Sequence, residues 1–315
     1  MRPSRPNGKR GPSLAHERKL WRAGHQIVAG MDEVGRGAWA GPLSVGVAVM
    51  TNGVRRVPTG LRDSKQLAEP VRENMFDRVG KWCGAWAVGH SSPLECDALG
   101  MTKALRLAAR RAFWALPPEA FPDAVVLDGS FDFLSPRKNG ADDRPVDDCG
   151  EDAFVQGEMI TDDPRITDSR VADLVSMLGD DPVYRELTHV ELPDGRRPQV
   201  KTVIKGDDLC ASVAAASVLA KVTRDRLMRG DAGNYPAFDF EQNKGYPSPS
   251  HKMALRGYGL TAIHRRTWAF VDWLPIRSTW DPQRDQTADV FLEEMPDLSL
   301  EEMPELSFEE LLPGE

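Results

Sequence analysis

The sequence predicts an α/β fold, and three observations support that prediction. Short apolar runs typical of buried strands alternate along the chain with segments whose apolar residues recur at helical spacing. Residues 209–228 have helical spacing and a face of small residues, which allows close packing on a sheet. The chain has 315 residues, so it can bury one large core.

Eight segments account for the predicted sheet and its covering helices. The expected strands are apolar runs bounded by turn residues or acids: 25–32, 42–51, 83–92, 122–130 and 200–208. The expected helices are 63–82, with Asp63 as N-cap; a segment that opens at Ser92 or Pro93 and runs to 116; and 209–228. The alternation indicates a sheet flanked by helices.

Composition divides the chain into a folded body and outlying segments. Residues 1–24 are basic, and the first 13 are rich in Arg, Pro and Gly, so this segment is expected to be partly disordered. The folded domain is expected over 25–278, with an acidic, turn-rich insertion at about 131–197 between two core strands. Residues 279–315 are expected to form an acidic, disordered tail.

The tail contains an eight-residue repeat over 292–315, in the order LEEMPDLS, LEEMPELS and FEELLPGE. A proline in each unit argues against a continuous helix, and each unit is too short and acidic to build a core. Two interpretations stay open. The tail is either a solubilising disordered segment or a repeated docking motif for an unknown protein partner with a basic, apolar groove.

The formal net charge of −8 conceals a basic body. Residues 281–315 hold 12 acids and one base, and residues 142–181 hold 13 acids and three bases. The remaining chain holds 36 bases and 23 acids, a net charge of +13. Such a body can attract a polyanion such as nucleic acid, although basic residues scattered over a solvated surface would give the same count.

The compartment is predicted from targeting signals and cysteines. The sequence has no apolar run of about 18 residues, and its basic N-terminus lacks the apolar region of a secretory signal. The four cysteines, Cys83, Cys96, Cys149 and Cys210, are widely spaced, which favours neither a zinc site nor a disulfide framework. We therefore expect a monomeric, cytoplasmic protein without a membrane partner.

Acidic residues stand where three expected strands end: Asp32 and Glu33, then Asp128, then Asp207. Ligands of open α/β sheets gather at the carboxyl ends of strands, so these acids are expected to converge. Four carboxylates repel one another unless cations neutralise them, and oxygen ligands without His or Cys suit Mg²⁺ or Mn²⁺. Two such ions can flank a phosphodiester, where one activates the attacking water and the other stabilises the leaving oxygen.

Each acid also has a purely structural interpretation. Asp128 can start a turn, and Asp207 or Asp208 can cap the helix that follows. Asp32 and Glu33 would point to opposite faces of a continuing strand, so a shared ligand role requires the strand to end there. Their common position after apolar runs favours the joint, functional interpretation.

A glycine-rich turn, GRGAWAG at 35–41, follows the first two acids. A dinucleotide site would need a helix after this turn, but Pro42 opens another strand-like run, and the neighbouring acids would repel a pyrophosphate. The sequence lacks G-K-[ST], which excludes a P-loop. The glycines are better suited to bringing the backbone close to the sugar or phosphate of a polymer.

A later loop and its neighbours offer further contacts to nucleic acid. Residues 243–251 include Lys244, Tyr246 and His251, and cations follow at 264–268. A tyrosine can stack on a sugar or base, although a tyrosine that simply packs in a loop is the more ordinary case.

Five segments in order resemble the ribonuclease HII family: GMDEVGRGAWAGPLSVGVAVM, DSKQL, VVLDGS, KGDDLCASVAAASVLAKVTRDRLM and NKGYPSPSH…GYGLTAIHRRTW. The resemblance spans roughly residues 25–275 without the insertion, and the pairing of DE-x-GRG with AAAS-x-LAKVTRD is highly specific. It implies an RNase H-like fold, which is a mixed five-stranded sheet flanked by helices with a C-terminal helical part.

The resemblance also implies an activity. The enzyme would hydrolyse the RNA strand of RNA/DNA hybrids and incise 5′ to single ribonucleotides embedded in duplex DNA, leaving 3′-hydroxyl and 5′-phosphate ends. Catalysis would use two metal ions, Mg²⁺ or Mn²⁺. The implied partners are RNA/DNA hybrids and ribonucleotide-containing DNA, and the implied role is ribonucleotide removal in DNA replication and repair.

The family's site residues carry over to matching positions. Its four catalytic, metal-ligating carboxylates fall on Asp32, Glu33, Asp128 and Asp207. Its ribose-contacting Gly-Arg-Gly motif, its phosphate-contacting lysine and its junction-sensing tyrosine fall on Gly35, Arg36, Gly37, Lys65 and Tyr246.

Two departures from the family pattern add negative charge: the long spacing between Asp128 and Asp207, and the tail repeat. Neither removes a site residue. Two alternatives remain, a noncatalytic interaction scaffold and a different RNase H-like nuclease or resolvase. The intact acids disfavour the first, and the Gly-Arg-Gly turn with Tyr246 disfavours the second.

Overall fold

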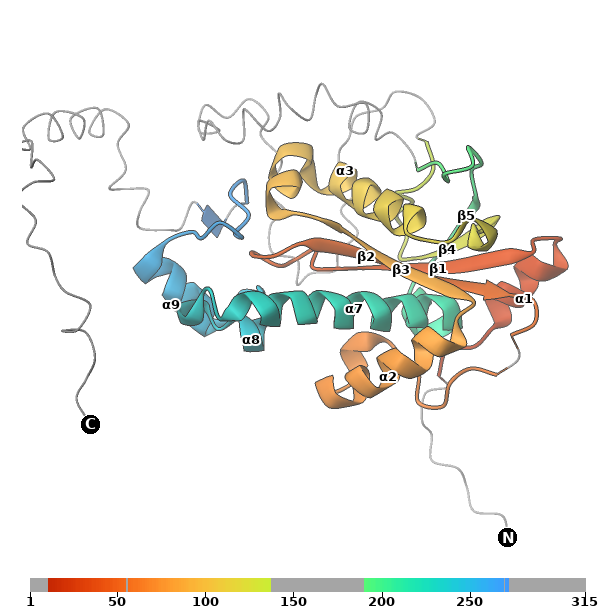
Figure 1. Ribbon diagram of the computed structural model, residues 1–315, viewed down its shortest axis with the longest axis horizontal. Coiled ribbons are helices and arrows are strands. Elements are labelled where there is room, and N and C mark those ends of the chain that lie inside the picture. The colour runs from red at the N-terminus through yellow and green to blue at the C-terminus, as the bar shows by residue number, and fades with distance from the viewer. Residues whose placement is uncertain (1–10, 55, 137–189, 269, 272–315) are drawn as a thin grey trace, which may run out of the picture. The chain divides into compact units, whose positions relative to one another are not determined.

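A mixed five-stranded sheet forms the centre of the protein in the computed structural model, which describes residues 11–54, 56–136, 190–268 and 270–271 (Figure 1). The strands are β1 (Ile27–Val34), β2 (Leu43–Thr51), β3 (Ala85–Ser91), β4 (Ala124–Asp128) and β5 (Gln199–Val203). Their order is β3-β2-β1-β4-β5. β2 pairs antiparallel with β1 and β3, whereas β4 pairs parallel with β1 and β5, so the predicted mixed sheet is confirmed.

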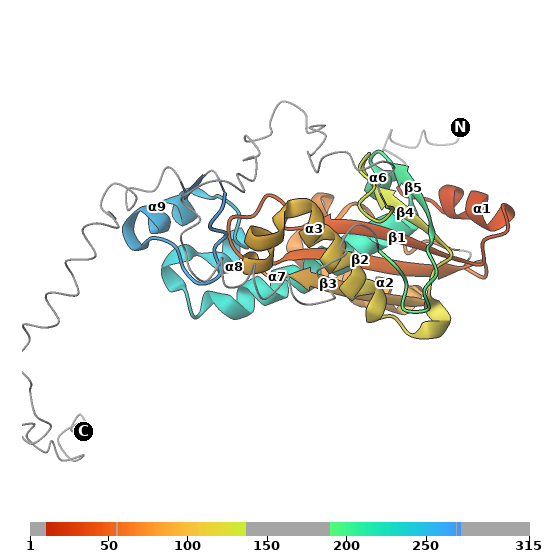
Figure 2. The ribbon, with the colours of Figure 1, turned by 90° about the horizontal axis from the view of Figure 1, so that it is seen from above.

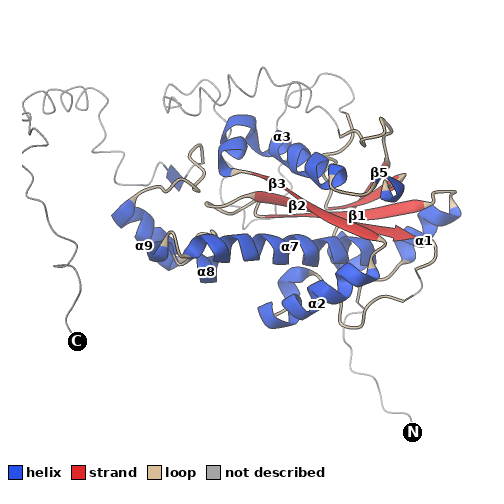
Figure 3. Cartoon of the chain, viewed as in Figure 1, coloured by secondary structure: helices blue, strands red, loops and turns tan. Residues whose placement is uncertain are grey.

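Helices cover both faces of this sheet, as Figure 3 shows. The helices are α1 (Ala15–Arg22), α2 (Glu69–Trp82), α3 (Pro93–Trp114), α6 (Gly206–Leu209), α7 (Ala211–Ala232), α8 (Phe240–Asn243) and α9 (Pro249–Tyr258). Short 3-10 turns are η1 (Ser64–Gln66), η2 (Pro118–Ala120) and η3 (Pro236–Phe238). α3 lies on one face, and α7 and α2 lie on the other (Figure 1). None of the described helices is long and apolar enough to cross a membrane.

The two-residue period of β2 divides the core into two layers. Val45, Val47 and Val49 face the cluster that includes α3, whereas Ala48 and Met50 belong to the cluster built on α7. α8 and α9 lie at one end of the molecule and α1 at the other (Figure 2), which confirms the C-terminal helical part.

The small-residue face of α7 packs directly on the strand backbones. A Cβ atom added at Gly30 of β1 would lie 2.2 Å from the Ser212 carbonyl carbon. A Cβ atom at Gly46 of β2 would lie 2.6 Å from the Ala216 oxygen. Glycine in the strands and alanine or serine in the helix therefore bring the helix and the sheet closer than ordinary side chains allow.

Two element boundaries differ from the sequence prediction. The predicted helix over 63–82 is broken, because Asp63 caps η1 by accepting a 3.0 Å hydrogen bond from the Lys65 amide, and α2 begins only at Glu69. Pro70 explains the restart, since proline fits the first turn of a helix but not its interior. The predicted strand over 200–208 ends at Val203, where Lys205 adopts a left-handed conformation with φ of 57°.

The packed core includes residues from two segments predicted to lie outside it: the N-terminal segment and the edges of the insertion. Before residue 25, Leu20 and Trp21 of α1 are buried in the core. At the edges of the predicted insertion, Leu134 and Val190 join the core and their backbones share a 2.8 Å hydrogen bond. The rest of the insertion (137–189) and the predicted tail (279–315) lie outside the described residues.

Candidate active site

Parallel strand pairing brings the predicted acids to one edge of the sheet. Met31 of β1 is opposite Leu127 of β4, so Asp32 and Asp128 are the next positions along adjacent strands. Asp128 Oδ1 accepts a 2.7 Å hydrogen bond from the Gly206 amide, which places Asp207 of α6 at the same edge. Residues far apart in sequence therefore lie along the same edge of the sheet.

The structural alternative for Asp207 is not what the fold shows. α7 begins at Ala211 after Cys210, and no side chain caps it, so neither Asp207 nor Asp208 is its N-cap. The Asp128 carboxylate accepts a hydrogen bond from the amide of Gly206, which follows β5, and so connects β4 to the start of α6.

The expectation that the first strand ends at Asp32 and Glu33 is wrong. β1 continues through both acids to Val34, with Asp32 opposite Gly46 and Glu33 opposite Val45. Their side chains therefore leave opposite faces of the strand. Asp32 is only 6% exposed, whereas the Glu33 side chain is 23% exposed.

The acids nevertheless act on one another electrostatically. Burial raises the pKa of Asp32 well above its usual range, and repulsion from Glu33 and Asp128 adds to this rise. Burial, together with repulsion from Asp128, also raises the pKa of Glu33 against the opposing charge of Arg36. Burial and then Asp128 raise the pKa of Asp207 to about 6. This corner of the fold therefore favours added positive charge.

Lys65 supplies part of that charge. Burial lowers its pKa, but attraction to Asp32, Asp63 and Asp207 outweighs this effect, so the pKa of Lys65 is raised. The capping contact from Asp63 to the Lys65 amide fixes this short turn beside the acids. Asp128 acts on this pKa in the same direction, so Lys65, predicted as a substrate contact, lies within electrostatic reach of four acids.

The donor chemistry fits a divalent cation, but the carboxylates are not gathered around one point. Hard oxygen donors suit Mg²⁺ or Mn²⁺. Within the described ranges, however, no three His, Cys, Asp or Glu side chains are grouped closely enough to hold a metal ion. Asp207 accepts instead from the Asp208 amide at 2.9 Å, and Glu33 lies 3.8 Å from Arg36. A bound cation would have to draw these side chains together.

Sequence reasoning missed a serine near the acids. The buried Ser217 hydroxyl on α7 donates a 2.9 Å hydrogen bond to the Ser64 hydroxyl, and it opposes the rise in the pKa of Asp32. The serine after the alanine run of 214–216 is the available signal, but its position alone predicts only close packing on the sheet.

The glycine-rich turn lies directly after the acids on β1. Gly35 has φ of 87°, and a Cβ atom there would lie 2.3 Å from Arg224 Nε, so only glycine fits. Gly37 differs, because a Cβ atom there would meet no atom within 4 Å. Packing within the described chain therefore explains the first glycine but not the second.

Tyr246, predicted as a substrate contact, lies beside this turn. Its hydroxyl accepts a 3.1 Å hydrogen bond from the Gly35 amide. Two cations flank its ring: Lys221 Nζ is 5.5 Å and the Arg224 guanidinium 5.4 Å from the centroid. The tyrosine is thus held beside the turn although 211 residues separate it from Gly35.

The other two candidates in that loop face inward. Lys244 is 5% exposed, and its ammonium lies 3.4 Å from Glu69. His251 is fully buried, and its Nε2 lies 2.8 Å from His264 Nε2. Both residues therefore stabilise the loop.

A buried arginine supports the turn from α7. Arg224 is fully buried and donates to the carbonyls of Pro42, Ala40 and Lys244 at 2.8, 3.0 and 2.9 Å. Arg224 thereby connects the end of the glycine-rich turn to the loop that carries Tyr246.

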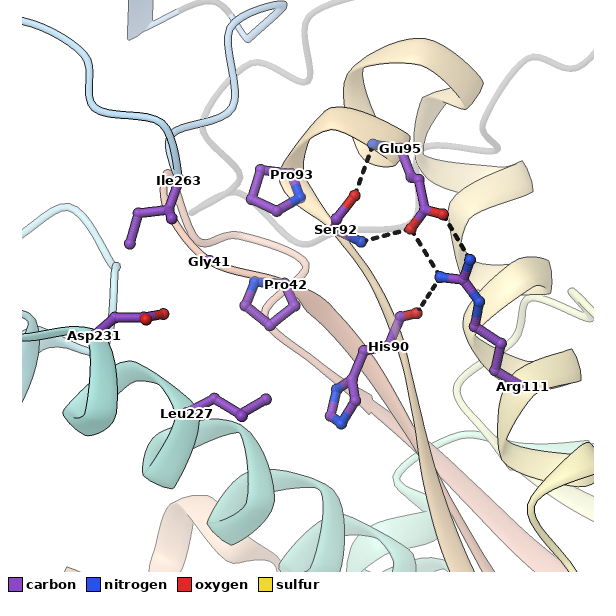
Figure 4. Close-up of a pocket in the computed structure, with 10 residues that line it drawn as sticks. All are labelled: Gly41, Pro42, His90, Ser92, Pro93, Glu95, Arg111, Leu227, Asp231 and Ile263. Carbon is purple, nitrogen blue, oxygen red and sulfur yellow. Dashed lines mark hydrogen bonds and ion pairs between the residues drawn. The ribbon is translucent and has the colours of Figure 1, made fainter. Parts of the chain in front are cut away.

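A cavity of about 330 Å³ adjoins the far end of this turn (Figure 4). Gly41 and Pro42 line one side, and Leu227 and Asp231 of α7 lie across from them. The Glu95 carboxylate in its wall is paired with Arg111 at 2.6 Å. None of the predicted site residues lines this cavity, so it is separate from the acids.

Comparisons with known proteins agree with this geometry. The model of the family described as ribonuclease HII matches residues 29–119 and 183–271. The chain is 42% identical over 253 residues to the ribonuclease HII of Streptomyces avermitilis, covering 80% of this chain and 81% of that protein. It is 40% identical over 252 residues to the ribonuclease HII of Streptomyces coelicolor, with the same two coverages.

A solved structure shares the fold. The crystal structure of the ribonuclease H2 from Pyrococcus horikoshii OT3 superposes with a TM-score of 0.53 at 27% identity. The match covers 81% of this chain and 100% of that one.

Proposed function

This chain belongs to the ribonuclease HII family and is a ribonuclease H, and we propose that it also incises duplex DNA on the 5′ side of single embedded ribonucleotides. The proposed substrates are RNA/DNA hybrids and DNA that contains ribonucleotides. The proposed products carry 3′-hydroxyl and 5′-phosphate ends. Such an enzyme would remove ribonucleotides during DNA replication and repair.

One observation carries this proposal: a corner of mutually repelling carboxylates lies two residues from a turn that packs against a tyrosine. The corner suits cations that act on a phosphodiester. The turn suits recognition of the sugar next to that bond, since the 2′-hydroxyl is what distinguishes RNA from DNA. Cleavage and ribose recognition would then act on neighbouring groups of one nucleotide.

The residues that would hold Mg²⁺ or Mn²⁺ are Asp32, Glu33, Asp128 and Asp207. Bound ions of this kind lower the pKa of an attacking water and stabilise a leaving oxygen. The raised pKa values of Asp32, Glu33 and Asp207 support this assignment, because a cation relieves the repulsion that raises them.

The chain's own cations and glycines would bind and orient the substrate. Lys65, beside the acids, would contact the phosphate, and the 35%-exposed Arg36 side chain would exchange its 3.8 Å contact with Glu33 for a neighbouring phosphate. The open space at Gly37 would admit the sugar. Tyr246 would pack at the junction between ribonucleotide and deoxyribonucleotide.

The test is a DNA duplex with one ribonucleotide, incubated with the protein and Mg²⁺ or Mn²⁺. We expect one nick, on the 5′ side of the ribonucleotide, which leaves a 3′-hydroxyl that a polymerase extends. The all-DNA duplex of the same sequence is the control and should stay intact. Absence of nicking, or cleavage of the all-DNA duplex, would overturn the proposal.

A further inference from the structure

Arg265 lies behind the glycine-rich turn and is fully buried. Its Nη2 donates to the Gly35 carbonyl at 2.6 Å, and its Nη1 donates to the Arg36 carbonyl at 2.9 Å. Its own amide donates to the Trp39 carbonyl at 2.9 Å. Among the described residues, no carboxylate forms an ion pair with Arg265, so its hydrogen bonds go to backbone carbonyls, and the Trp268 ring lies 4.7 Å from its guanidinium.

The two contacts to Arg265 also fix the directions of two backbone N–H groups. The described residues contain no cis peptide bond. In a planar trans peptide, the carbonyl of one residue and the N–H of the next point in opposite directions. The carbonyls of Gly35 and Arg36 point inward to Arg265. The N–H groups of Arg36 and Gly37 therefore point away from it.

Those two amides are also the ones that lack acceptors. In the turn from Gly35 to Gly41, five amides donate within the described chain: Gly35, Ala38, Trp39, Ala40 and Gly41. Within the described residues, the amides of Arg36 and Gly37 have no such acceptor. Gly37 is exposed. A backbone donor with no partner in the fold is available to a ligand.

We propose that Arg265 is a positioning residue that aims the Arg36 and Gly37 amides at the 2′-oxygen of the substrate ribose. Its fork holds both peptide planes at once, which one rotating donor cannot do. Its positive charge behind two aligned peptide dipoles also strengthens both N–H groups as donors, and successive N–H groups form a concavity for an oxygen acceptor. This inference rests on the proposed function, because it assigns the origin of its ribose preference.

The test measures ribose preference in binding, apart from cleavage. In an Asp32→Asn background, dissociation constants are determined for two duplexes that differ by one 2′-hydroxyl. Arg265→Gln removes the charge and the fork, and Arg265→Lys keeps the charge but loses the fork. We expect the preference for the ribose duplex to fall about tenfold or more in Arg265→Gln and by less in Arg265→Lys. Affinity for the all-DNA duplex should stay within about twofold of the parent.

Arg106→Gln is the matched control. Arg106 is also a buried arginine, 3% exposed, and donates to a backbone carbonyl, that of Phe133, at 3.1 Å. It lies on α3, in the layer of the core across the sheet from α7. Its substitution should leave the preference between the two duplexes unchanged.

Each outcome decides the matter. An unchanged preference in both Arg265 variants, an equal loss of affinity for both duplexes, or the same effect from Arg106→Gln would overturn the inference while leaving the proposed function intact. A parent protein without ribose preference would instead refute the proposed function, and the inference with it. Thermal unfolding shows which variants fold, and Arg265→Lys decides the question if Arg265→Gln does not.

Discussion

In the glycine-rich turn, buried arginines meet the backbone carbonyls, whereas at the neighbouring edge of the sheet carboxylates raise one another's pKa. Five of the seven amides of the turn donate within the described chain, the Gly35 amide to Tyr246 among them. The acid corner has no grouped set of ligands among the described residues. The proposed recognition half of the site is therefore organised by contacts within the fold, whereas the proposed catalytic half would need cations to complete it.

The largest effect should come from Asp32→Asn, which separates these halves. Removing one carboxylate that would hold the metal ions should lower the cleavage rate about 10³-fold or more, since bound ions contribute several kcal/mol to such reactions. The protein should still fold and still prefer the ribonucleotide duplex in binding. Single-turnover cleavage and a binding titration measure the two properties. Near-normal turnover would refute the ligand role of Asp32.

Gly35→Ala and Gly37→Ala should differ in their effects on stability. The first substitution places a Cβ atom 2.3 Å from Arg224 Nε and 2.7 Å from the Pro42 oxygen, at a positive φ. We expect it to lower the free energy of unfolding by about 2 kcal/mol or more. The second meets nothing within 4 Å, so stability should change by less than about 0.5 kcal/mol.

Activity then distinguishes the two glycines. Gly37→Ala should raise KM for the single-ribonucleotide duplex, because its methyl group fills space that the sugar would enter. Thermal unfolding and steady-state kinetics on the same preparations provide the comparison. If Gly37→Ala cleaves like the wild type, the sugar does not approach this glycine.

Asp207→Asn should show that repulsion between the acids destabilises the fold when no cation is bound. Because the folded-state pKa of Asp207 is raised to about 6 from 3.8, its charged form destabilises the fold. The contribution of Asp207 to stability in the metal-free wild type should be most favourable below about pH 4 and become less favourable as the pH rises through 6. Asparagine carries no charge, so the variant should be more stable by about 1–3 kcal/mol at pH 8 and equal near pH 4.

Metal ions should reduce this difference in stability. Mg²⁺ or Mn²⁺ should raise the melting temperature of the wild type at pH 8 and raise that of Asp207→Asn less, because ligand binding stabilises the folded state that binds it. Thermal unfolding at both pH values with and without metal tests the prediction. A metal-free variant less stable than the wild type at pH 8 would contradict repulsion at this corner.

The same division explains what the sequence could and could not predict. Apolar runs that end in acids identify strand ends locally, and parallel pairing then brings Asp32 and Asp128 together without further information. The Arg265 contact to Gly35 has no local signature, and the serine after the alanine run does not by itself indicate that Ser217 lies near Asp32. Both depend on how α7 and the C-terminal segment pack against β1, which only the assembled core determines.

The predicted end of the first strand and the predicted edges of the insertion differ from the structure for a related reason. β1 continues to Val34 because β2 offers it partners up to Ser44, whatever the side chains of Asp32 and Glu33 are. The core contacts of Leu134 and Val190 were missed because the acidic residues between them dominate the local composition. Composition averages over a window, whereas burial is decided residue by residue.

The smallest expected effect concerns residues 281–315, which lie outside the described residues and carry a net charge of −11. Deleting them should tighten binding to all-DNA duplex at low salt, because a polyanion is repelled by this charge. The gain should be a fewfold and should shrink as salt screens the charges. A variant with the segment's acids changed to Asn or Gln keeps its length and separates charge from size.

The comparison between the two halves sharpens this last prediction. In the proposed function the arginine-held turn would contact one hydroxyl at close range, whereas the tail's charge would act on every phosphate at longer range. Deletion should therefore tighten binding to ribonucleotide and all-DNA duplexes by the same factor and leave their ratio unchanged. Salt titrations of both affinities test this, and the slope of log affinity against log salt should change equally for the two duplexes. Unaltered affinity at low salt would show that the acidic segment does not oppose duplex binding.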